Sequence, residues 1–198
     1  MMDTTKFIQS IVGKSKSLAV DVGLYDDTRP FTKLLKDKKS LVGVEIGVCT
    51  GINSLSMLEK LDISMLYGVD PYLIYDEYKE SWYEDSQDFF NAVKQEAYDR
   101  LRPYLNNYTF VKKFSVDAID FIPDDLDFVY IDGNHDYDFV KQDIELWFPK
   151  IKSGGVIGGH DFFNMNEHFG VHKAVIEFAV NNNLDLFFKN PDWWFFKL

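Results

Sequence analysis

The stretch Leu41-Val-Gly-Val-Glu-Ile-Gly-Val-Cys-Thr-Gly51 decides the fold of this chain. It is an apolar run that closes on Glu45 and then carries Gly47 and Gly51, which is typical of a buried parallel strand turning tightly into a helix. Because glycine has no Cβ, the backbone can approach a ligand closely here, and the following helix aims free N–H groups at partly negative atoms. The register is E-x-G-x-x-x-G and not G-x-G-x-x-G, so a nucleotide-like ligand is predicted without a diphosphate cradle.

A second strand pattern, Ser64 to Asp70, ends in a carboxylate nineteen residues after Gly51. An acid at about this distance, at the end of the second strand of such a unit, commonly meets the two hydroxyls of a ribose. Glu45 and Asp70 together therefore indicate a nucleoside. Each feature alone is equally compatible with an α/β protein that binds no nucleoside, because glycine turns and acidic strand ends are common in that class.

After the first forty residues, strand and helix patterns alternate, which predicts a parallel sheet with helices on both faces and a single domain over residues 1–198. Residues 1–40 are predicted to form an N-terminal helical cap, and residues 72–107 an aromatic-rich helical insertion. Its first part, 72–85, is interpreted either as a lid over a bound small molecule or as packing against the N-terminal helices. Residues 184–198 are predicted to form two strands around an Asn-Pro-Asp turn.

Composition limits the classes of partner and compartment. A net charge of −11 argues against a nucleic acid substrate, because phosphate binding relies on clustered Lys and Arg. The single cysteine, Cys49, excludes an intrachain disulfide and fits a reducing compartment. Residues 1–17 have neither a continuous apolar core nor a small-residue cleavage site, and no run approaches membrane-spanning length, so no signal peptide or membrane partner is expected.

A second group of polar residues follows two later strand patterns. Asp132 and His135 come after one strand, and His160 and Asp161 end the next. Because ligands of open α/β sheets bind at the carboxyl ends of the strands, these side chains are expected to meet. Carboxylate oxygens suit Mg²⁺, and imidazoles widen the choice to Mn²⁺ or Fe²⁺. The alternative interpretation of the two acids is helix capping.

These motifs resemble the class I S-adenosylmethionine-dependent methyltransferases. The string Asp132-Gly-Asn-His-Asp-Tyr137, with the later His160-Asp161 pair, is similar to their small-molecule O-methyltransferase branch, which includes macrocin-type, cephalosporin-pathway-like and, more distantly, catechol O-methyltransferases. The resemblance covers about residues 41–178. It implies a Rossmann-like, doubly wound, mostly parallel seven-stranded sheet with an antiparallel C-terminal hairpin strand.

The resemblance also implies roles for individual residues. The segment from Glu45 to Gly51, called the glycine loop below, would wrap the methionine part of S-adenosyl-L-methionine. Asp70 would hold the ribose hydroxyls. Ser115 would lie near the adenine, although it also fits an ordinary helix N-cap. Acids matching Asp132 and Asp161 hold a divalent ion in metal-dependent members, and a histidine matching His135 serves as base in sugar-modifying members. The predicted site residues are Glu45, Gly47, Gly51, Asp70, Ser115 and Asp132 for the cofactor, Asp132, His160 and Asp161 for a metal, and His135 and Asp132 for catalysis.

The sequence thus predicts a cytoplasmic enzyme that transfers a methyl group from S-adenosyl-L-methionine to a small-molecule acceptor, at a hydroxyl oxygen, with assistance from Mg²⁺ or another divalent cation. Two alternatives stay open: a metal-independent N- or carboxyl-methyltransferase, and a non-catalytic cofactor-binding or interaction domain of the same fold. The glycine spacing disfavours a nicotinamide dehydrogenase. No nucleic acid or membrane partner is expected, and the sequence leaves open a homo-oligomer.

Overall fold

A computed structural model describes residues 19–21, 29–75, 86–162, 169–189 and 191–198 of the chain. The helices and strands are, in chain order, β1 (Ala19–Asp21), α2 (Pro30–Leu35), β2 (Leu41–Ile46), α3 (Ile52–Lys60), β3 (Ile63–Val69), α4 (Gln87–Leu101), η1 (Arg102–Tyr104), β4 (Tyr108–Val111), α5 (Ser115–Ala118), η2 (Ile119–Phe121), β5 (Leu126–Ile131), α6 (Tyr137–Trp147), β6 (Ile151–Gly159), α7 (Phe169–Asn182), β7 (Leu186–Lys189) and β8 (Asp192–Phe196).

One sheet forms the centre of the molecule, with strand order β1-β7-β8-β6-β5-β2-β3-β4. Strands β2 to β6 are parallel, and β8 runs antiparallel to both β6 and β7. The predicted mostly parallel seven-stranded sheet with its closing hairpin is therefore confirmed. The three-residue strand β1, parallel to β7, adds an eighth strand at the edge. Strands β3 and β4 follow β2 on one side of it in the sheet, whereas the next strand, β5, lies on the other side of β2. Open α/β sheets bind ligands at such a switch point, where successive strands change sides.

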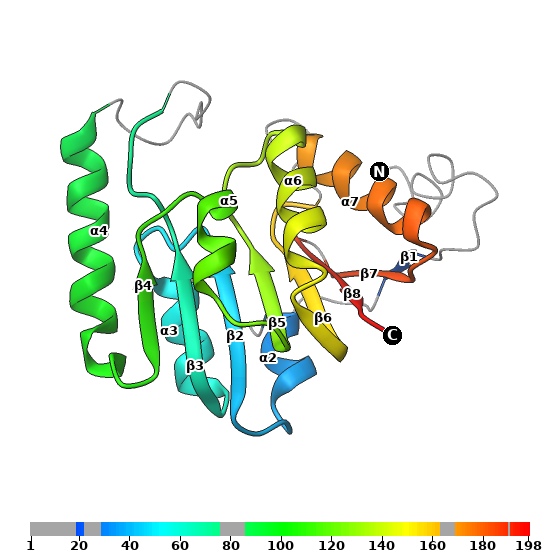
Figure 1. The fold of residues 1–198 in the computed structure, drawn as a ribbon, viewed down its shortest axis with the longest axis horizontal. Coiled ribbons are helices and arrows are strands. Elements are labelled where there is room, and N and C mark those ends of the chain that lie inside the picture. Colours follow the sequence, from blue (N-terminus) through cyan, green and yellow to red (C-terminus); the bar gives the residue numbers. More distant parts are fainter. Residues whose placement is uncertain (1–18, 22–28, 76–85, 163–168, 190) are drawn as a thin grey trace.

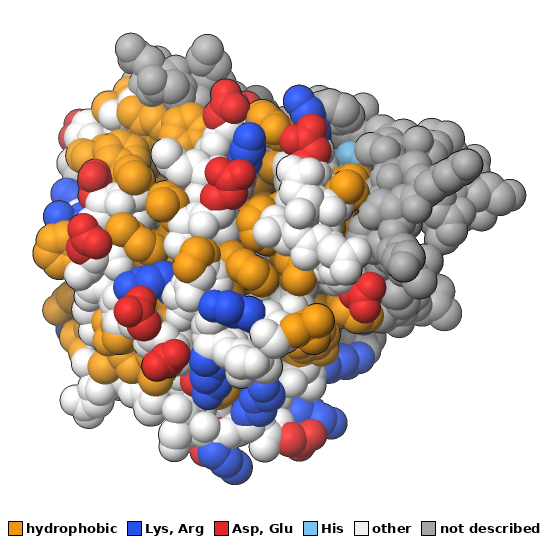
Figure 2. Space-filling model, turned by 45° about the vertical axis from the view of Figure 1, so that its right-hand side comes forward, with side chains coloured by type: hydrophobic (Ala, Val, Ile, Leu, Met, Phe, Trp, Pro, Cys, Tyr) orange, Lys and Arg blue, Asp and Glu red, His pale blue; other side chains and the backbone are white. Residues whose placement is uncertain are grey.

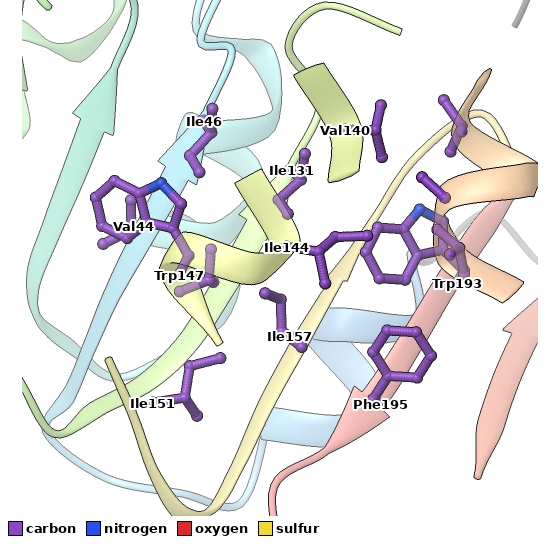
Figure 3. Packing of buried hydrophobic residues seen from close by; sticks show 14 of the residues in the cluster. Val44, Ile46, Ile131, Val140, Ile144, Trp147, Ile151, Ile157, Trp193 and Phe195 are labelled. Carbon is purple, nitrogen blue, oxygen red and sulfur yellow. The ribbon is translucent and has the colours of Figure 1, made fainter. Parts of the chain in front are cut away.

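Helices cover both faces of the sheet, as the alternating patterns predict (Figure 1). Strand β5 is buried at all six positions, because its side chains alternate between two faces of the sheet that are both covered by helices. Val129 and Ile131 pack with α6 and α7, as Figure 3 shows for part of that cluster, while Phe128 and Tyr130 pack with α2, α3 and α4. Burial on both faces holds the strand ends rigidly, and this positions the side chains that follow them.

One face of the molecule carries many charged side chains. Acidic and basic side chains are interspersed there among hydrophobic ones (Figure 2).

Of the predicted N-terminal cap, the structure describes the strand β1 and residues 29–40, which contain helix α2. Residues 1–18 and 22–28 lie outside the described residues. Of the predicted lid, only 72–75 are described. Helix α4 begins after Ser86, whose hydroxyl accepts a hydrogen bond from the Phe89 amide at 3.2 Å.

Candidate active site

A cavity of about 730 Å³ opens at the carboxyl ends of the central parallel strands. It is lined by all but one of the predicted site residues, namely Glu45, Gly47, Asp70, Ser115, Asp132, His135, His160 and Asp161. The exception is Gly51. A Cβ at Gly51 would lie 2.8 Å from the Leu101 side chain, so this glycine lets α4 pack against the start of α3. The structure thus gives Gly51 a packing role in place of cavity lining.

Gly47 follows strand β2 directly and packs against Asp132, the residue after strand β5. Its φ is +85°, and an added Cβ would lie 2.0 Å from the carbonyl oxygen of Asp132. The amide of Asp132 donates to the carbonyl of Ile46 at 2.7 Å, which fixes the two strand ends to each other. Both the left-handed backbone and the lack of space therefore require glycine at this position.

Asp70 fastens the glycine loop to the end of β3. One carboxylate oxygen accepts from the amides of Val48 and Cys49, each at 3.0 Å, and the other accepts from the amide of Tyr72 at 2.8 Å. The Tyr72 hydroxyl makes a further hydrogen bond to the loop, donating to the carbonyl of Cys49 at 3.0 Å. Burial raises the pKa of Asp70, although these backbone hydrogen bonds oppose the shift. A carboxylate has about four acceptor sites, so one remains for a ligand hydroxyl.

Glu45, the one acid in the stretch from Leu41 to Gly51, is buried beneath the loop. Its side chain accepts a hydrogen bond from Asn53 at 2.8 Å and another from the Ser54 hydroxyl, both on α3. Burial raises the pKa of Glu45 to about 7, although the bonds from Ser54 and Asn53 oppose the shift. Glu45 therefore ties strand β2 to helix α3 at the floor of the cavity.

The acids and histidines after β5 and β6 form one cluster, as expected from their places in the sequence. The His135 Nε2 lies 3.1 Å from Asp161 Oδ2 and 3.7 Å from Asp132 Oδ1. The His160 Nδ1 lies 2.8 Å from Asp161 Oδ2 and 3.9 Å from Asp132 Oδ1. Asp161 has a φ of +59°, a left-handed conformation that directs its carboxylate between the two imidazoles.

This arrangement sets the charge of the cluster. Burial alone would raise the pKa of Asp161, but hydrogen bonds with His135 and His160 hold it well below its usual range. Burial would lower the pKa of His160, but the bond to Asp161 and the charge of Asp132 outweigh it and raise that pKa. Ligand atoms of Asp132, His135 and Asp161 all lie within 4.8 Å of one another. Among the described residues, these three form a group that could hold a cation, and the predicted ligand His160 adjoins it through Asp161, so the metal site stays a prediction.

Three residues at this site were missed by sequence reasoning: Arg29, Tyr130 and Asp192. Arg29 Nη1 lies 3.8 Å from Asp132 Oδ2 and 3.9 Å from Asp192 Oδ1. It also donates to the Tyr130 hydroxyl, which in turn donates to Asp192 at 2.9 Å. Contacts spanning 101 and 62 positions leave no local signal in a single sequence. Arg29 holds one oxygen of Asp132, so the other faces His135.

The cavity wall also contains Ser115 and a further missed acid, Asp143. Ser115 is the first residue of α5, and Phe114 occupies the N-cap position, so the structure does not show Ser115 as the cap. The Trp147 indole donates to Ser115 Oγ at 2.6 Å. Ser115 is bonded in turn to the buried Asp143, whose pKa burial raises to about 7 against that bond.

Comparison with known proteins identifies the family. The model of a family described as a methyltransferase domain matches residues 44–162, which is more than half of the chain and contains the whole run from Glu45 to Asp161. The chain belongs to this methyltransferase family. Family and fold together support S-adenosylmethionine-dependent methyl transfer.

Curated relatives match only part of their own length. An uncharacterized protein of Acanthamoeba polyphaga mimivirus is 28% identical over 131 residues, which are 64% of this chain and 53% of that protein. An uncharacterized protein of Sinorhizobium fredii is 30% identical over 106 residues, which are 51% of this chain and 11% of that protein. The chain thus spans about half of the first relative and about a tenth of the second.

Solved structures share the methyltransferase fold. The O-methyltransferase NovP is 18% identical with a TM-score of 0.59, over 80% of this chain and 72% of that chain. The O-methyltransferase TomG of Streptomyces achromogenes, solved with S-adenosylmethionine, is 12% identical with a TM-score of 0.59, over 87% and 82%. These likenesses are of fold. Among the described residues, no helix has both the length and the apolar character needed to cross a membrane.

Proposed function

We propose that this methyltransferase transfers the methyl group of S-adenosyl-L-methionine to a hydroxyl oxygen of a small-molecule acceptor. The observation that carries the proposal is the triad Asp132, His135 and Asp161, whose ligand atoms gather at the cavity where β5 and β6 end. A hydroxyl is a weak nucleophile, so its proton must be removed as the bond to carbon forms. A histidine held by a carboxylate is suited to that task.

The cavity residues fit the methyl donor. Gly47 leaves room for close approach at the loop, Asp70 keeps an acceptor site for a ribose hydroxyl, and Ser115 lies at another part of the wall. When bound, S-adenosyl-L-methionine supplies an activated methyl group attached to a positively charged sulfur. Acidic residues beside the loop, Asp70 and Asp132, suit a positively charged ligand.

The chain's own residues would then act on the acceptor. His135 takes the hydroxyl proton on the ring nitrogen that does not face Asp161, and Asp161, whose Oδ2 lies 3.1 Å from His135 Nε2, stabilises the resulting imidazolium. Arg29 keeps Asp132 oriented from the far side. The apolar part of the wall, which includes Phe139, excludes water and so protects the sulfonium from hydrolysis.

A divalent cation forms a second version of this proposal. Asp132, His135 and Asp161 would hold the ion, which would lower the pKa of a bound hydroxyl and fix its position. Magnesium belongs in the test because the MycE methyltransferase, a fold relative with a TM-score of 0.51 and 16% identity over 82% of this chain and 46% of that chain, was solved with Mg, S-adenosylhomocysteine and mycinamycin VI. Because a nitrogen that binds a metal cannot also take a proton, His160 would replace His135 as base in this version.

One observation favours the metal-independent version, including transfer to an amine or a carboxylate. Arg29, His135 and His160 already surround the carboxylates of Asp132 and Asp161, so the cluster has cationic or hydrogen-bonding partners without an ion. An amine or carboxylate acceptor needs less help to become nucleophilic than a hydroxyl does.

The composition supports the remaining parts of the proposal. A net charge of −11 fits a small-molecule acceptor in place of a nucleic acid, and one cysteine fits work in the cytoplasm. A homo-oligomer stays a prediction of the sequence.

The test is transfer of an isotopically labelled methyl group to a panel of hydroxylated small molecules, amines and carboxylates, in a chelator and with added Mg²⁺ or Mn²⁺. We expect labelled methyl ethers, with His135→Gln and Asp161→Asn each losing about 10²- to 10⁴-fold in rate. Asp138→Asn, an exposed acid on α6 outside the cavity, is the matched control. Activity that survives the chelator would select the metal-independent version, and label on amines or carboxylates alone would refute the hydroxyl acceptor.

A further inference from the structure

A second cavity lies outside the candidate active site, between helix α4 and strands β3 and β4 at one edge of the sheet. Its volume is about 340 Å³, which is enough for a small organic molecule. Figure 1 shows α4 beside β4, and the two elements meet where the ring centroids of Tyr98 and Phe110 lie 5.9 Å apart. The proposed methyl transfer does not use this cavity.

The wall of the second cavity is mainly apolar and partly aromatic. Tyr98 comes from α4 and is 43% exposed, whereas Phe110 and Val111 come from β4. The ring of Phe110 packs in turn on the buried Tyr108, with centroids 4.8 Å apart. Aromatic rings that border a cavity favour a ligand with a flat apolar body, because ring-on-ring contact buries a large apolar area.

Both charged side chains of this wall are cations, Lys94 on α4 and Lys112 directly after β4. Among the residues that the structure describes, no acid lines this cavity, although the chain has 32 Asp and Glu against 21 Lys and Arg. In the described part of the chain, neither lysine is recorded in an ion pair. The positions three and four residues before and after Lys94 on the helix also hold no acid. Two lysines beside an apolar cavity therefore suit the anionic group of a ligand.

Tyr72 separates this cavity from the candidate active site. It lines both cavities, is 3% exposed, and donates its hydroxyl hydrogen to the Cys49 carbonyl at 3.0 Å. A ligand in the second cavity would contact Tyr72 without entering the space beside Asp132 and His135. The two cavities can therefore be filled at the same time.

We propose that the second cavity binds a small aromatic carboxylate, with its ring against Tyr98 and Phe110. Its carboxylate lies between the ammonium groups of Lys94 and Lys112. The ring supplies buried apolar area, and the carboxylate supplies charge-assisted hydrogen bonds. An exposed ion pair alone contributes little, so binding needs both halves of the ligand. This binding goes beyond the proposed methyl transfer and does not depend on it.

The test uses 2-naphthoate and its neutral amide, 2-naphthamide, which have nearly the same shape. Calorimetric titration into the full chain should show one naphthoate bound per chain, with the amide at least about tenfold weaker. Saturating S-adenosylhomocysteine should change the naphthoate affinity by less than about twofold, because the probe does not enter the active site. The pair 4-phenylbutyrate and 4-phenylbutyramide repeats the comparison with a slimmer body.

Variants locate the probe. Lys94→Met and Lys112→Met keep an unbranched side chain and remove its charge, so each should weaken naphthoate about 3- to 10-fold and leave the amide nearly unchanged. Tyr98→Ala should weaken both probes, because it removes the ring contact. Lys113→Met is the matched control: Lys113 lies over the Phe121 ring at 4.3 Å and lines neither of the two cavities, so both affinities should be kept.

Several outcomes overturn the inference. Equal affinity for a carboxylate and its amide would show that charge is not recognised. Displacement by S-adenosylhomocysteine, or an equal loss in Lys113→Met, would place the probe elsewhere. No binding of either carboxylate at about 5 mM to protein that is shown to be folded would leave the cavity without such a ligand. A dimer in light scattering that Tyr98→Ala converts to a monomer would assign the cavity to a second copy of the chain.

The same titrations keep this inference apart from the proposed function. Naphthoate binding that depends on both lysines, in a protein that does not bind S-adenosylhomocysteine, would support the second site and count against the methyl donor. The reverse result would overturn the second site and leave the proposed function in place.

Discussion

Replacing Glu45 by Gln should stabilise the protein at alkaline pH and leave its stability nearly unchanged at acidic pH. Glu45 is 1% exposed, and burial raises its pKa from 4.5 to about 7 against the hydrogen bonds from Ser54 and Asn53. The raised pKa means that the folded state holds the Glu45 proton more tightly than the unfolded state. Between pH 4.5 and 7 the folded protein therefore binds more protons at this site, and its stability falls as the pH rises.

The magnitude follows from the shift. A difference of about 2.5 pKa units at about 1.4 kcal/mol each makes the ionised Glu45 cost at most about 3.5 kcal/mol above pH 7. Glutamine resembles the protonated side chain in shape and charge. The expected gain in the free energy of unfolding is therefore about 2 to 3 kcal/mol at pH 8 and close to zero at pH 4.5, which at pH 8 corresponds to a rise of about 5 to 10 °C in Tm.

Urea unfolding of wild type and Glu45→Gln at several pH values between 4.5 and 8 measures this difference directly. Glu59→Gln, an exposed acid on α3, is the matched control and should change the free energy of unfolding by less than about 0.5 kcal/mol at every pH. A Glu45→Gln protein that is no more stable than wild type at pH 8, or that gains equally at both ends of the range, would refute the reasoning.

Three further changes test other parts of the site. Gly47→Ala should lower the free energy of unfolding by about 2 to 5 kcal/mol, because its Cβ would meet the Asp132 carbonyl in a left-handed backbone. The control Gly154→Ala, at a glycine with φ +77° and nothing within 4 Å of an added Cβ, should lower it by about 1 kcal/mol. Urea unfolding of the two variants measures both values. Arg29→Met should lower the rate of labelled-methyl transfer about tenfold or more by releasing Asp132, and an unchanged rate would remove Arg29 from the site. Tyr72→Phe loses the bond to the Cys49 carbonyl and should cost about 1 kcal/mol in a thermal melt; no shift in Tm would show that this bond does not hold the loop.

Much of the fold was predictable because its signals are local. The apolar stretch before Gly47 and the alternation of strand and helix patterns indicate a parallel sheet, and the Asn-Pro-Asp turn indicates the closing hairpin. Asp132 and Asp161 were expected to meet because parallel strands end at the same edge of a sheet, and their carboxylates do share His135. The edge strand β1 gave no such signal, since three residues are too few for a period.

Other parts of the site depend on contacts between distant segments. Arg29 meets Tyr130 across 101 positions, and nothing near Arg29 in the sequence indicates that it faces an acid cluster. Asp143 looks like one more polar residue of an amphipathic helix, and only the packing of α6 against α5 shows that it is buried. Gly51 illustrates the reverse case, because a glycine that fits a ligand loop proves to make room for Leu101.

The most direct test of the central claim is calorimetric titration of S-adenosyl-L-methionine into the purified, chelator-treated protein. We expect saturable binding of one molecule per chain, lost in Gly47→Ala and kept in Gly154→Ala, whose glycine lies away from the cavity. Absence of binding to a wild-type protein that is shown to be folded would contradict the account and favour a non-catalytic domain of the same fold.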